Sequence, residues 1–231
     1  MDVNNLPPVP TLSPPDTSRI VVRECEERLL CASELLDGKL LFSPQYYLQQ
    51  IPGETSKIYM RETVAHMLCE AQRRLPAGYR LLVFDAWRPV SVQKSLFSAY
   101  CAKLSLNPLF SNLSKEQLCQ KAREFVSYPS ADPLKPFVHS TGGAVDLSIV
   151  NERGEALDMG THFDEFTPAA YAASFENSHN LTVRNNRRLL HYVMTSVGFS
   201  GYYAEWWHFD YGDPFWASAV GKPAIYGGIY A

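Results

Sequence analysis

Residues 138–147 constrain the fold more than any other stretch, because they combine two adjacent glycines, a strand pattern and a His–Asp pair. Apolar residues alternate with small or polar ones over residues 144–149, which predicts a half-buried strand with Asp146 on its more polar face. Gly142 and Gly143 allow a sharp turn before this strand, so His139 is expected to fold back over the same face. A His and an Asp that converge in this way suit a divalent metal such as zinc. The simpler alternative is a plain hydrogen bond between the two side chains.

The motif Glu205-Trp206-Trp207-His208 could supply a third metal ligand and a general base, which residues 138–147 lack. A catalytic zinc site usually has three protein ligands, and His208 is a natural third beside His139 and Asp146. Glu205 is then the candidate general base for a metal-activated water. Residues three apart face opposite ways in a regular strand, so this interpretation requires a bulge or a hairpin bend near Glu205. The alternative is that the tryptophans are core residues and that Glu205 and His208 lie on a surface turn.

Arg88 belongs to a third motif, Asp85-Ala86-Trp87-Arg88-Pro89, which follows a predicted buried strand at residues 79–84. A cation in this place could bind a substrate carboxylate or stabilise the oxyanion that forms when water attacks a carbonyl. The alternative is a structural ion pair with Asp85 that only braces the end of the strand.

These motifs resemble those of the D-alanyl-D-alanine dipeptidases, the zinc enzymes that include the vancomycin-resistance dipeptidases. All three occur in the order that the family has, and the resemblance covers about residues 58–210. It implies one zinc ion (Zn2+) per chain as cofactor. The roles that the resemblance implies are zinc binding by His139, Asp146 and His208, base catalysis by Glu205 and transition-state stabilisation by Arg88.

The resemblance extends to Met159-Gly160-Thr161-His162-Phe163-Asp164 and implies that Asp164 holds the free amine of the substrate. The alternative is that Asp164 only caps or braces its loop. One position departs from the family. Its best-known members have a small hydroxyl residue two positions before the first zinc His, where this chain has Phe137, so a strict preference for D-Ala-D-Ala does not follow.

The expected function is therefore zinc-dependent hydrolysis of a small zwitterionic dipeptide, most simply D-alanyl-D-alanine. Two alternatives stay open, namely a D,D-carboxypeptidase or endopeptidase that acts on peptidoglycan stem peptides, and a zinc-containing binding module without turnover. The net charge of -3, without blocks of like charge, gives no reason to expect nucleic acid or an anionic membrane as partner. The N-terminal residues show neither a basic start nor an apolar run, which favours a cytoplasmic protein. The sequence leaves the oligomeric state open.

The hydrophobic pattern predicts a single catalytic domain at residues 20–231, preceded by a proline-rich arm at residues 1–19. We expect an α+β fold, as the resemblance implies, in which a small and mostly antiparallel sheet carries the zinc site and helices pack against it. The predicted helices cover residues 58–75, 90–104, 115–127 and 182–197. The predicted strands cover residues 79–84, 144–149, 199–203 and 206–209. Residues 158–180 are predicted to form a loop over the site.

Two residue types that often bind metals are assigned no such role outside the motifs. The five cysteines are scattered and look like small buried hydrophobes of a reducing compartment. The histidines expected not to bind metal are His66, His162, His179 and His191.

Overall fold

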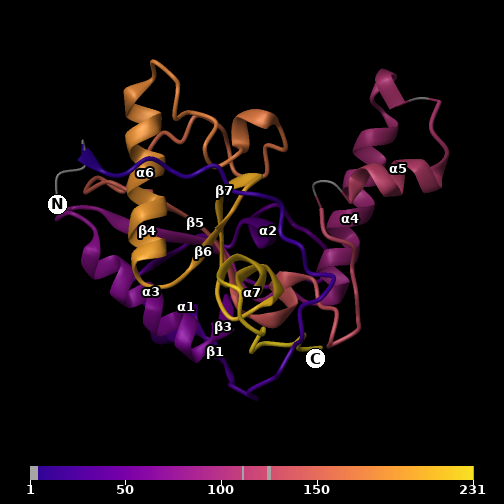
Figure 1. Ribbon diagram of the computed structural model, residues 1–231, viewed down its shortest axis with the longest axis horizontal. Helices are drawn as coiled ribbons and strands as arrows, with labels where there is room; N and C mark the ends of the chain where they lie inside the picture. Colours follow the sequence, from indigo (N-terminus) through magenta and orange to yellow (C-terminus); the bar gives the residue numbers. More distant parts are fainter. Residues whose placement is uncertain (1–4, 111, 124–125, 231) are drawn as a thin grey trace.

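The computed structural model describes residues 5–110, 112–123 and 126–230. In this part of the chain the main sheet has five strands in the order β2-β4-β5-β7-β6, and all neighbours are antiparallel except β2 and β4 (Figure 1). The strands are β2 (Leu41–Phe42), β4 (Arg80–Asp85), β5 (Ala144–Val150), β7 (Glu205–Asp210) and β6 (Ser200–Tyr202). The predicted α+β fold with a mostly antiparallel sheet is confirmed.

Strand β5 forms the centre of this sheet, and all seven of its residues are buried. Leu147 points into the main hydrophobic core, which also contains Val64 and Leu190 from two helices. The sequence pattern predicted a half-buried strand, and this is wrong because the opposite face is buried as well. Ser148 on that face is 2 % exposed and lines a cavity with Met159 and Phe163, so the loop that follows the strand covers it.

Helices α3 (Glu62–Arg74) and α6 (Leu181–Ser196) pack side by side against the sheet (Figure 1). The helix predicted from residue 58 begins at Glu62 instead. The residues before it form β3 (Tyr59–Arg61), which pairs with β1 (Leu29–Cys31) in a separate two-stranded sheet. Met60 was assigned to the helical stripe but is fully buried in β3. Pairing with a distant strand therefore overrides the local helical pattern at this end.

Helices α4 (Val90–Ser105) and α5 (Lys115–Ala122) form a lobe at one edge of the molecule (Figure 1). Ser114 caps α5 by accepting a hydrogen bond from the backbone N–H of Gln117, and the Gln117 side chain accepts one in return from the backbone of Ser114. This is the predicted capping box. Helix α5 ends at Ala122, and Glu124 and Phe125 of the predicted last turn lie outside the described residues.

The shorter elements include three helices that the sequence analysis missed, of which α7 (Pro214–Val220) is the longest. The Asp213 side chain begins it by accepting hydrogen bonds from the backbone N–H groups of Phe215 and Trp216. The others are α1 (Ala32–Leu35), α2 (Gln45–Leu48) and three single turns of 3-10 helix at Pro108–Phe110, Val138–Thr141 and Pro168–Ala170. No helix in the described residues is long and apolar enough to cross a membrane.

The N-terminal segment, from residue 5 on, runs across α6 (Figure 1). Leu6 and Val9 are buried, at 7 % and 4 % exposure. The backbone N–H of Val9 donates a hydrogen bond to Glu176 at 2.9 Å, and Arg188 donates one to the Leu6 carbonyl at 3.4 Å. The described part of the proline-rich arm therefore packs on the body, while its division from a catalytic domain stays a prediction.

Arg61, the last residue of β3, ties three distant segments together and is 1 % exposed. Its guanidinium donates hydrogen bonds to the Thr141 carbonyl at 2.8 Å, to the Glu24 carboxylate at 2.8 Å and to the Gly227 carbonyl at 3.3 Å. Thr141 closes the turn that contains His139, so this buried cation joins that turn to segments near both ends of the chain.

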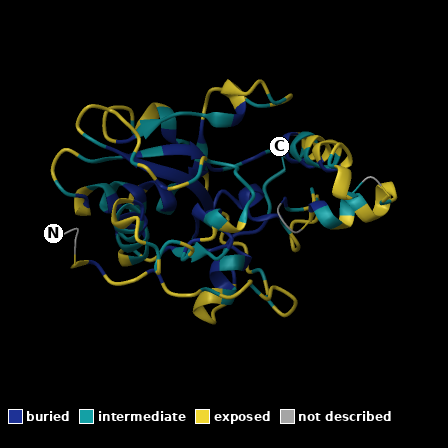
Figure 2. Ribbon diagram, turned by 90° about the horizontal axis from the view of Figure 1, so that it is seen from above, coloured by how far each residue is buried: buried dark blue, intermediate teal, exposed yellow. Residues whose placement is uncertain are grey.

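The cysteines do not behave as predicted. Cys25 is exposed, and Cys31, Cys69, Cys101 and Cys119 are half-buried, so none is a fully buried core residue. For Cys101 and Cys119, the colouring in Figure 2 shows the reason. Deep burial concentrates at the sheet, whereas the α4–α5 lobe is mostly half-buried or exposed.

Candidate metal centre

His139, Asp146 and His208 converge in one buried cluster, and their ligating atoms all lie within 4.8 Å of one another. The Asp146 carboxylate lies 3.4 Å from His139 Nε2 and 3.0 Å from His208 Nδ1, and the two ring nitrogens are 3.3 Å apart. Asp146 and His208 stand directly opposite each other in the pairing of β5 with β7. The register of two neighbouring strands therefore sets two of the three side chains.

The two glycines bring the third side chain, His139, back to the strand. Gly142 ends the 3-10 turn at a φ of 72°, a left-handed conformation that favours glycine. A Cβ atom on Gly143 would lie 2.3 Å from the backbone oxygen of Tyr211, so no side chain fits there. The sequence prediction that His139 folds over the face that carries Asp146 matches this geometry.

The outer nitrogen of each imidazole is held by an acceptor. His139 Nδ1 lies 2.7 Å from the Ala86 carbonyl, which can only accept, so this nitrogen carries a proton and Nε2 faces the cluster. His208 Nε2 lies 2.7 Å from the Asp210 carboxylate, which leaves Nδ1 to face the cluster. Histidine ligands of metals are usually fixed in this manner. The donor atoms therefore fit a metal ion, and Asp210 is a participant that the sequence analysis missed.

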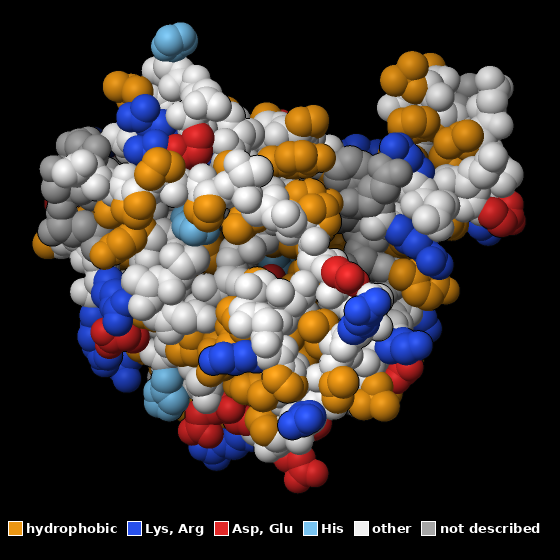
Figure 3. Space-filling model, in the orientation of Figure 1, with side chains coloured by type: hydrophobic (Ala, Val, Ile, Leu, Met, Phe, Trp, Pro, Cys, Tyr) orange, Lys and Arg blue, Asp and Glu red, His pale blue; other side chains and the backbone are white. Residues whose placement is uncertain are grey.

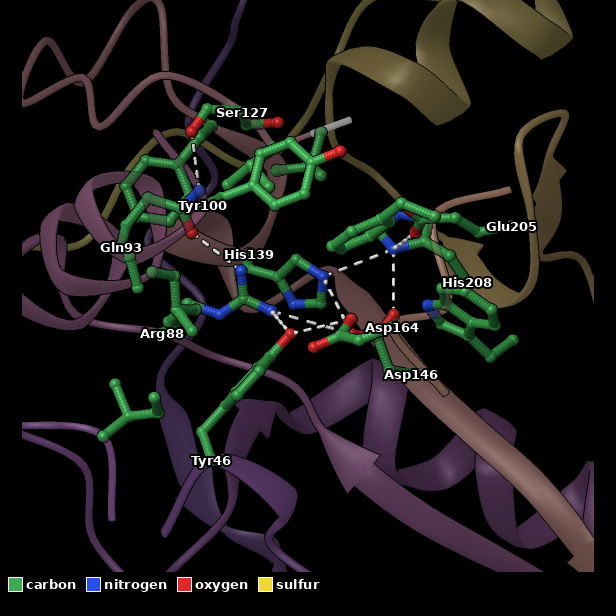
Figure 4. A pocket seen from close by; sticks show the side chains of 18 of the residues that line it. Tyr46, Arg88, Gln93, Tyr100, Ser127, His139, Asp146, Asp164, Glu205 and His208 are labelled. Carbon is green, nitrogen blue, oxygen red and sulfur yellow. Dashed lines mark hydrogen bonds and ion pairs between the residues drawn. The ribbon is translucent and has the colours of Figure 1, made fainter. Parts of the chain in front are cut away.

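Glu205 reaches the same cluster through an irregular pairing of β6 with β7. Gly201 pairs with Phe209, but the next residue, Tyr202, pairs with Glu205, so the β7 strand bulges between these pairs. The Glu205 carboxylate lies 3.9 Å from His208 Nδ1, and its side chain is 15 % exposed. The bulge that the sequence interpretation required is present, and it turns Glu205 and His208 toward one centre (Figure 4).

The charges of the cluster act on its carboxylates in opposite directions. Burial raises the pKa of Asp146, but the charges and hydrogen bonds of His139 and His208 outweigh this effect and hold the pKa below its usual range. Burial, with the charges of Asp146 and Asp164, raises the pKa of Glu205 to about 8, although His208 and Arg88 oppose the shift. Asp146 is therefore a stable anion, whereas Glu205 can exchange a proton near neutral pH.

Arg88 is braced by Asp85 and also faces the cluster. Its Nε and Nη2 atoms donate hydrogen bonds to one Asp85 oxygen at 2.9 Å and 2.6 Å, and Nη1 donates one to Gln93 at 2.7 Å. Nη2 lies 3.6 Å from the Asp146 carboxylate. The structural ion pair considered for Arg88 therefore exists, and it holds the guanidinium beside the candidate metal ligands.

Asp164 lies near Arg88 on the side of the cluster away from Glu205 (Figure 4). Its backbone has a φ of 59°, which is rare for a residue other than glycine. Burial, with the charges of Asp146 and Asp85, raises the pKa of Asp164 to about 7, against the effects of Arg88 and Tyr46. The Tyr46 hydroxyl donates a hydrogen bond to Asp164 at 3.3 Å and lies 3.3 Å from Arg88 Nη2. Tyr46 is the second participant that the sequence analysis missed.

One cavity of about 330 Å3 is lined by the three candidate metal ligands and by Glu205, Arg88, Asp164 and Tyr46. Phe137, at the position that departs from the family, lines this cavity and is 5 % exposed. One wall is a continuous face of α4 formed by Leu96, Ala99, Tyr100 and Lys103. The predicted loop over the site contributes Asp164 and Phe166, and the Phe166 ring packs on Tyr100 with 5.2 Å between the ring centroids.

The remaining histidines lie apart from the cluster. His66, His162 and His179 are exposed, and His191 is half-buried in α6. Within the described residues, His139, Asp146 and His208 are the only group of three His, Cys, Asp or Glu side chains close enough to share a metal ion.

Comparison with known proteins identifies one family. Residues 48–220 match the sequence profile of Peptidase_M15, described as D-ala-D-ala dipeptidase. The chain is 30% identical over 218 residues to the D-alanyl-D-alanine dipeptidase of Synechocystis sp. (strain ATCC 27184 / PCC 6803 / Kazusa), which covers 86% of this chain and 87% of that protein. It is 31% identical over 164 residues to the D-alanyl-D-alanine dipeptidase of Enterococcus faecalis (strain ATCC 700802 / V583), with 68% and 74% coverage.

A third relative has a similar percentage of identical residues over a shorter alignment. The D-alanyl-D-alanine dipeptidase of Escherichia coli (strain K12) is 32% identical over 134 residues, which cover 58% of this chain and 56% of that protein. Among solved structures, VanYB in complex with D-Alanine-D-Alanine aligns with a TM-score of 0.45 and 16% identity over 74% of this chain and 83% of that chain. This structural likeness is too low to support an argument about function.

Proposed function

The chain belongs to the Peptidase_M15 family of D-Ala-D-Ala dipeptidases, and on this premise we propose that it is a zinc-dependent dipeptidase that hydrolyses D-alanyl-D-alanine. The observation that carries the proposal is the buried convergence of His139, Asp146 and His208 with Glu205 beside them. Family membership over most of the chain supports the same activity. The substrate is then a small zwitterion, which suits a cavity that contains both carboxylates and a guanidinium.

The proposed zinc ligands are His139 Nε2, His208 Nδ1 and the Asp146 carboxylate. Two imidazole nitrogens and one carboxylate oxygen are a typical donor set for catalytic zinc, which keeps a further position open. When bound, a zinc ion supplies a Lewis acid that polarises the scissile carbonyl and lowers the pKa of the attacking water.

Glu205 is the proposed general base. Its carboxylate takes a proton from the attacking water and later delivers that proton to the amine of the leaving residue. Burial and the neighbouring carboxylates raise the pKa of Glu205, so its carboxylate accepts a proton more readily than an exposed one does. The bulge in β7 is what allows the carboxylate to reach the same centre as His208.

Arg88 and Asp164, which share the Tyr46 hydroxyl as a neighbour, have separate proposed roles toward the substrate. Arg88, held in place by Asp85 and Gln93, offers positive charge to the oxyanion that develops as water adds. Asp164, which accepts a hydrogen bond from Tyr46, binds the free ammonium group of the substrate. A peptide with a blocked N-terminus has no charge for Asp164 to bind and is expected to react poorly.

The deciding experiment combines metal analysis with a chelator-sensitive peptidase assay on the purified protein. Three substrates are compared, namely D-Ala-D-Ala, an N-blocked dipeptide and a stem pentapeptide. We expect one zinc ion per chain, hydrolysis of D-Ala-D-Ala, loss of activity with chelator and its return with zinc. Preferential cleavage of the pentapeptide would replace the proposal with a D,D-carboxypeptidase. Stoichiometric zinc without turnover of any substrate would make the protein a binding module.

A further inference from the structure

Two cysteines meet where α4 and α5 touch, away from the candidate metal centre. Cys101 lies in α4, Cys119 lies in α5, and their Sγ atoms are 3.6 Å apart. Both thiols are free and half-buried. A disulfide bond is about 2.05 Å long, so the two sulfur atoms need to approach by about 1.5 Å to form one.

The surroundings of this pair allow such a movement. Phe97, Leu104, Ala122 and Val126 form a small hydrophobic core that is separate from the main one, and both cysteines pack at its edge. Helix α5 packs chiefly against α4, and Figure 3 shows the lobe projecting from the body of the molecule. A small shift of α5 along α4 therefore leaves the main sheet undisturbed.

We propose that Cys101 and Cys119 form a redox-active pair, which an oxidant of the peroxide class converts into a disulfide that joins α4 to α5. The thiolate of one cysteine attacks the O–O bond of the peroxide and forms a sulfenic acid, and hydroxide leaves. The second thiolate attacks this sulfur, the S–S bond forms and a second hydroxide leaves. The two thiol protons convert both hydroxides to water. The pair loses two electrons and hydrogen peroxide gains them.

Geometry selects these two cysteines from the five. Cys25 is exposed, and the Sγ atom of Cys31 lies 3.7 Å from the hydroxyl of Ser33. Among the described residues, Cys101 and Cys119 are the only two cysteines with sulfur atoms in hydrogen-bonding distance of each other. Burial and the neighbouring Cys119 thiol raise the pKa of Cys101 to about 11, so thiolate is scarce at neutral pH and the bond forms slowly.

The bond would act on one wall of the cavity and leave the cluster of proposed metal ligands intact. Tyr100 and Lys103, which flank Cys101 along α4, line the same cavity as His139. The disulfide closes residues 101–119 into a loop, which reduces the freedom of the lobe when it unfolds. The lobe should therefore resist proteolysis several-fold better after oxidation, while zinc content stays the same.

The test is a thiol count and a peptide map of the whole protein after treatment with hydrogen peroxide in mildly alkaline buffer. The number of thiols titrated under denaturing conditions should fall by at least two of the five, because the cross-link consumes Cys101 and Cys119. The map should contain one cross-linked peptide that joins Cys101 to Cys119, and dithiothreitol should remove it. The proposal is overturned if Cys101 and Cys119 both still react with an alkylating reagent after the peroxide treatment. A cross-link between any other two cysteines would overturn it as well.

Variants provide the matched comparison. Cys101→Ser and Cys119→Ser should each abolish the cross-linked peptide and the protection from protease. Cys25→Ser, which changes the exposed cysteine, should keep both. The peptide map of the protein without substitutions tests the proposed disulfide even if a variant folds poorly. None of these readouts depends on dipeptide hydrolysis, so the test of the disulfide is independent of the proposed function.

Discussion

His208 is fixed at both ring nitrogens, and the outer partner decides which of them can bind a metal. Asp210 lies two residues further along β7, on the same face of the strand, and is 1 % exposed. Its carboxylate accepts a hydrogen bond from Nε2 and so directs the lone pair of Nδ1 toward Asp146. The zinc affinity of the proposed site should therefore depend on Asp210, a residue that is not itself a proposed ligand.

Removing Asp210 should weaken zinc binding. We expect Asp210→Ala to lower zinc affinity by about 10- to 100-fold, the usual effect of losing a partner behind a histidine ligand, and Asp210→Asn to have an intermediate effect. A chelator competition titration measures both, and a thermal melt shows that the variants are folded. The matched control is Asp37→Ala, an exposed aspartate in an isolated β-bridge with Leu40. Unchanged affinity in a folded Asp210→Ala protein would contradict this role.

Glu205 should be separable from metal binding. We expect Glu205→Ala to retain its zinc but to lose a factor of about 100 or more in kcat, because a general base contributes about that much to a hydrolysis. Metal analysis measures the retained zinc, and the dipeptidase assay on the same sample measures the loss in kcat. A zinc-loaded variant that still turns over at the original rate would rule out Glu205 as the base.

At the scale of elements, the site rests on a turn before β5 and a bulge in β7. The turn needs glycine at residue 143 because the backbone of Tyr211 passes too close for a side chain. The bulge provides what a regular strand cannot, since it lets residues three apart face one point. Two local departures from regular structure thus place His139 and Glu205 around the regular Asp146–His208 pair.

The turn can be tested by adding one methyl group. Gly143→Ala should displace the turn, lower the melting temperature and weaken zinc binding, because the new Cβ atom would lie 2.3 Å from a backbone oxygen. Gly154→Ala is the comparison. That glycine has a φ of 78° but open space around it, so alanine there should cost only about 1–2 kcal/mol of backbone strain and leave zinc affinity unchanged. Equal zinc affinity in both variants would contradict the steric role of Gly143.

Helix α6 carries a histidine that should make stability depend on pH. Burial lowers the pKa of His191 from 6.5 to about 4, although Glu176 opposes the shift. The unfolded chain therefore binds a proton between these two values that the folded chain does not, and stability falls as pH falls through this window. This histidine alone should cost about 2 kcal/mol between pH 7 and pH 5.

Urea unfolding at several pH values measures this contribution. His191→Gln cannot gain the proton, so the free energy of unfolding of this variant should fall less steeply between pH 7 and pH 5 than that of the original protein. Only the difference in slope is compared, because the substitution also alters packing against Phe209. Parallel curves would show that His191 is not held in its neutral form.

At the scale of the whole molecule, the described part of the N-terminal arm belongs to the packed body. Leu6 and Val9 are buried against the region of α6, and Glu176 and Arg188 bind the backbone of the arm. Deletion of residues 1–12 should therefore destabilise the fold by about 2–5 kcal/mol, from the lost burial of two apolar side chains. Zinc content should not change. Denaturant unfolding and metal analysis check both statements, and an unaltered unfolding midpoint would contradict them.

The sequence predicted those parts of the site that local patterns encode. His139 and Asp146 are joined by a short turn and a strand, and the bulge near Glu205 could be anticipated because the chemistry required it. Tyr46 could not be found, because it lies 118 residues from Asp164 in a weakly patterned region and meets it only through the fold. Asp210 was within reach, since its spacing from His208 places it on the same strand face. The two-stranded sheet at Met60 was missed because distant pairing outweighed a helical pattern.

Arg61 gives the molecule a property of interest for protein engineering. One guanidinium contacts the turn that contains His139, the segment around Glu24 and the segment around Gly227. A fusion partner or affinity tag that displaces either of these two segments would therefore break hydrogen bonds to the same guanidinium that holds the turn of His139. A circular permutant that reopens the chain in the exposed turn at Gly154 would leave this junction intact.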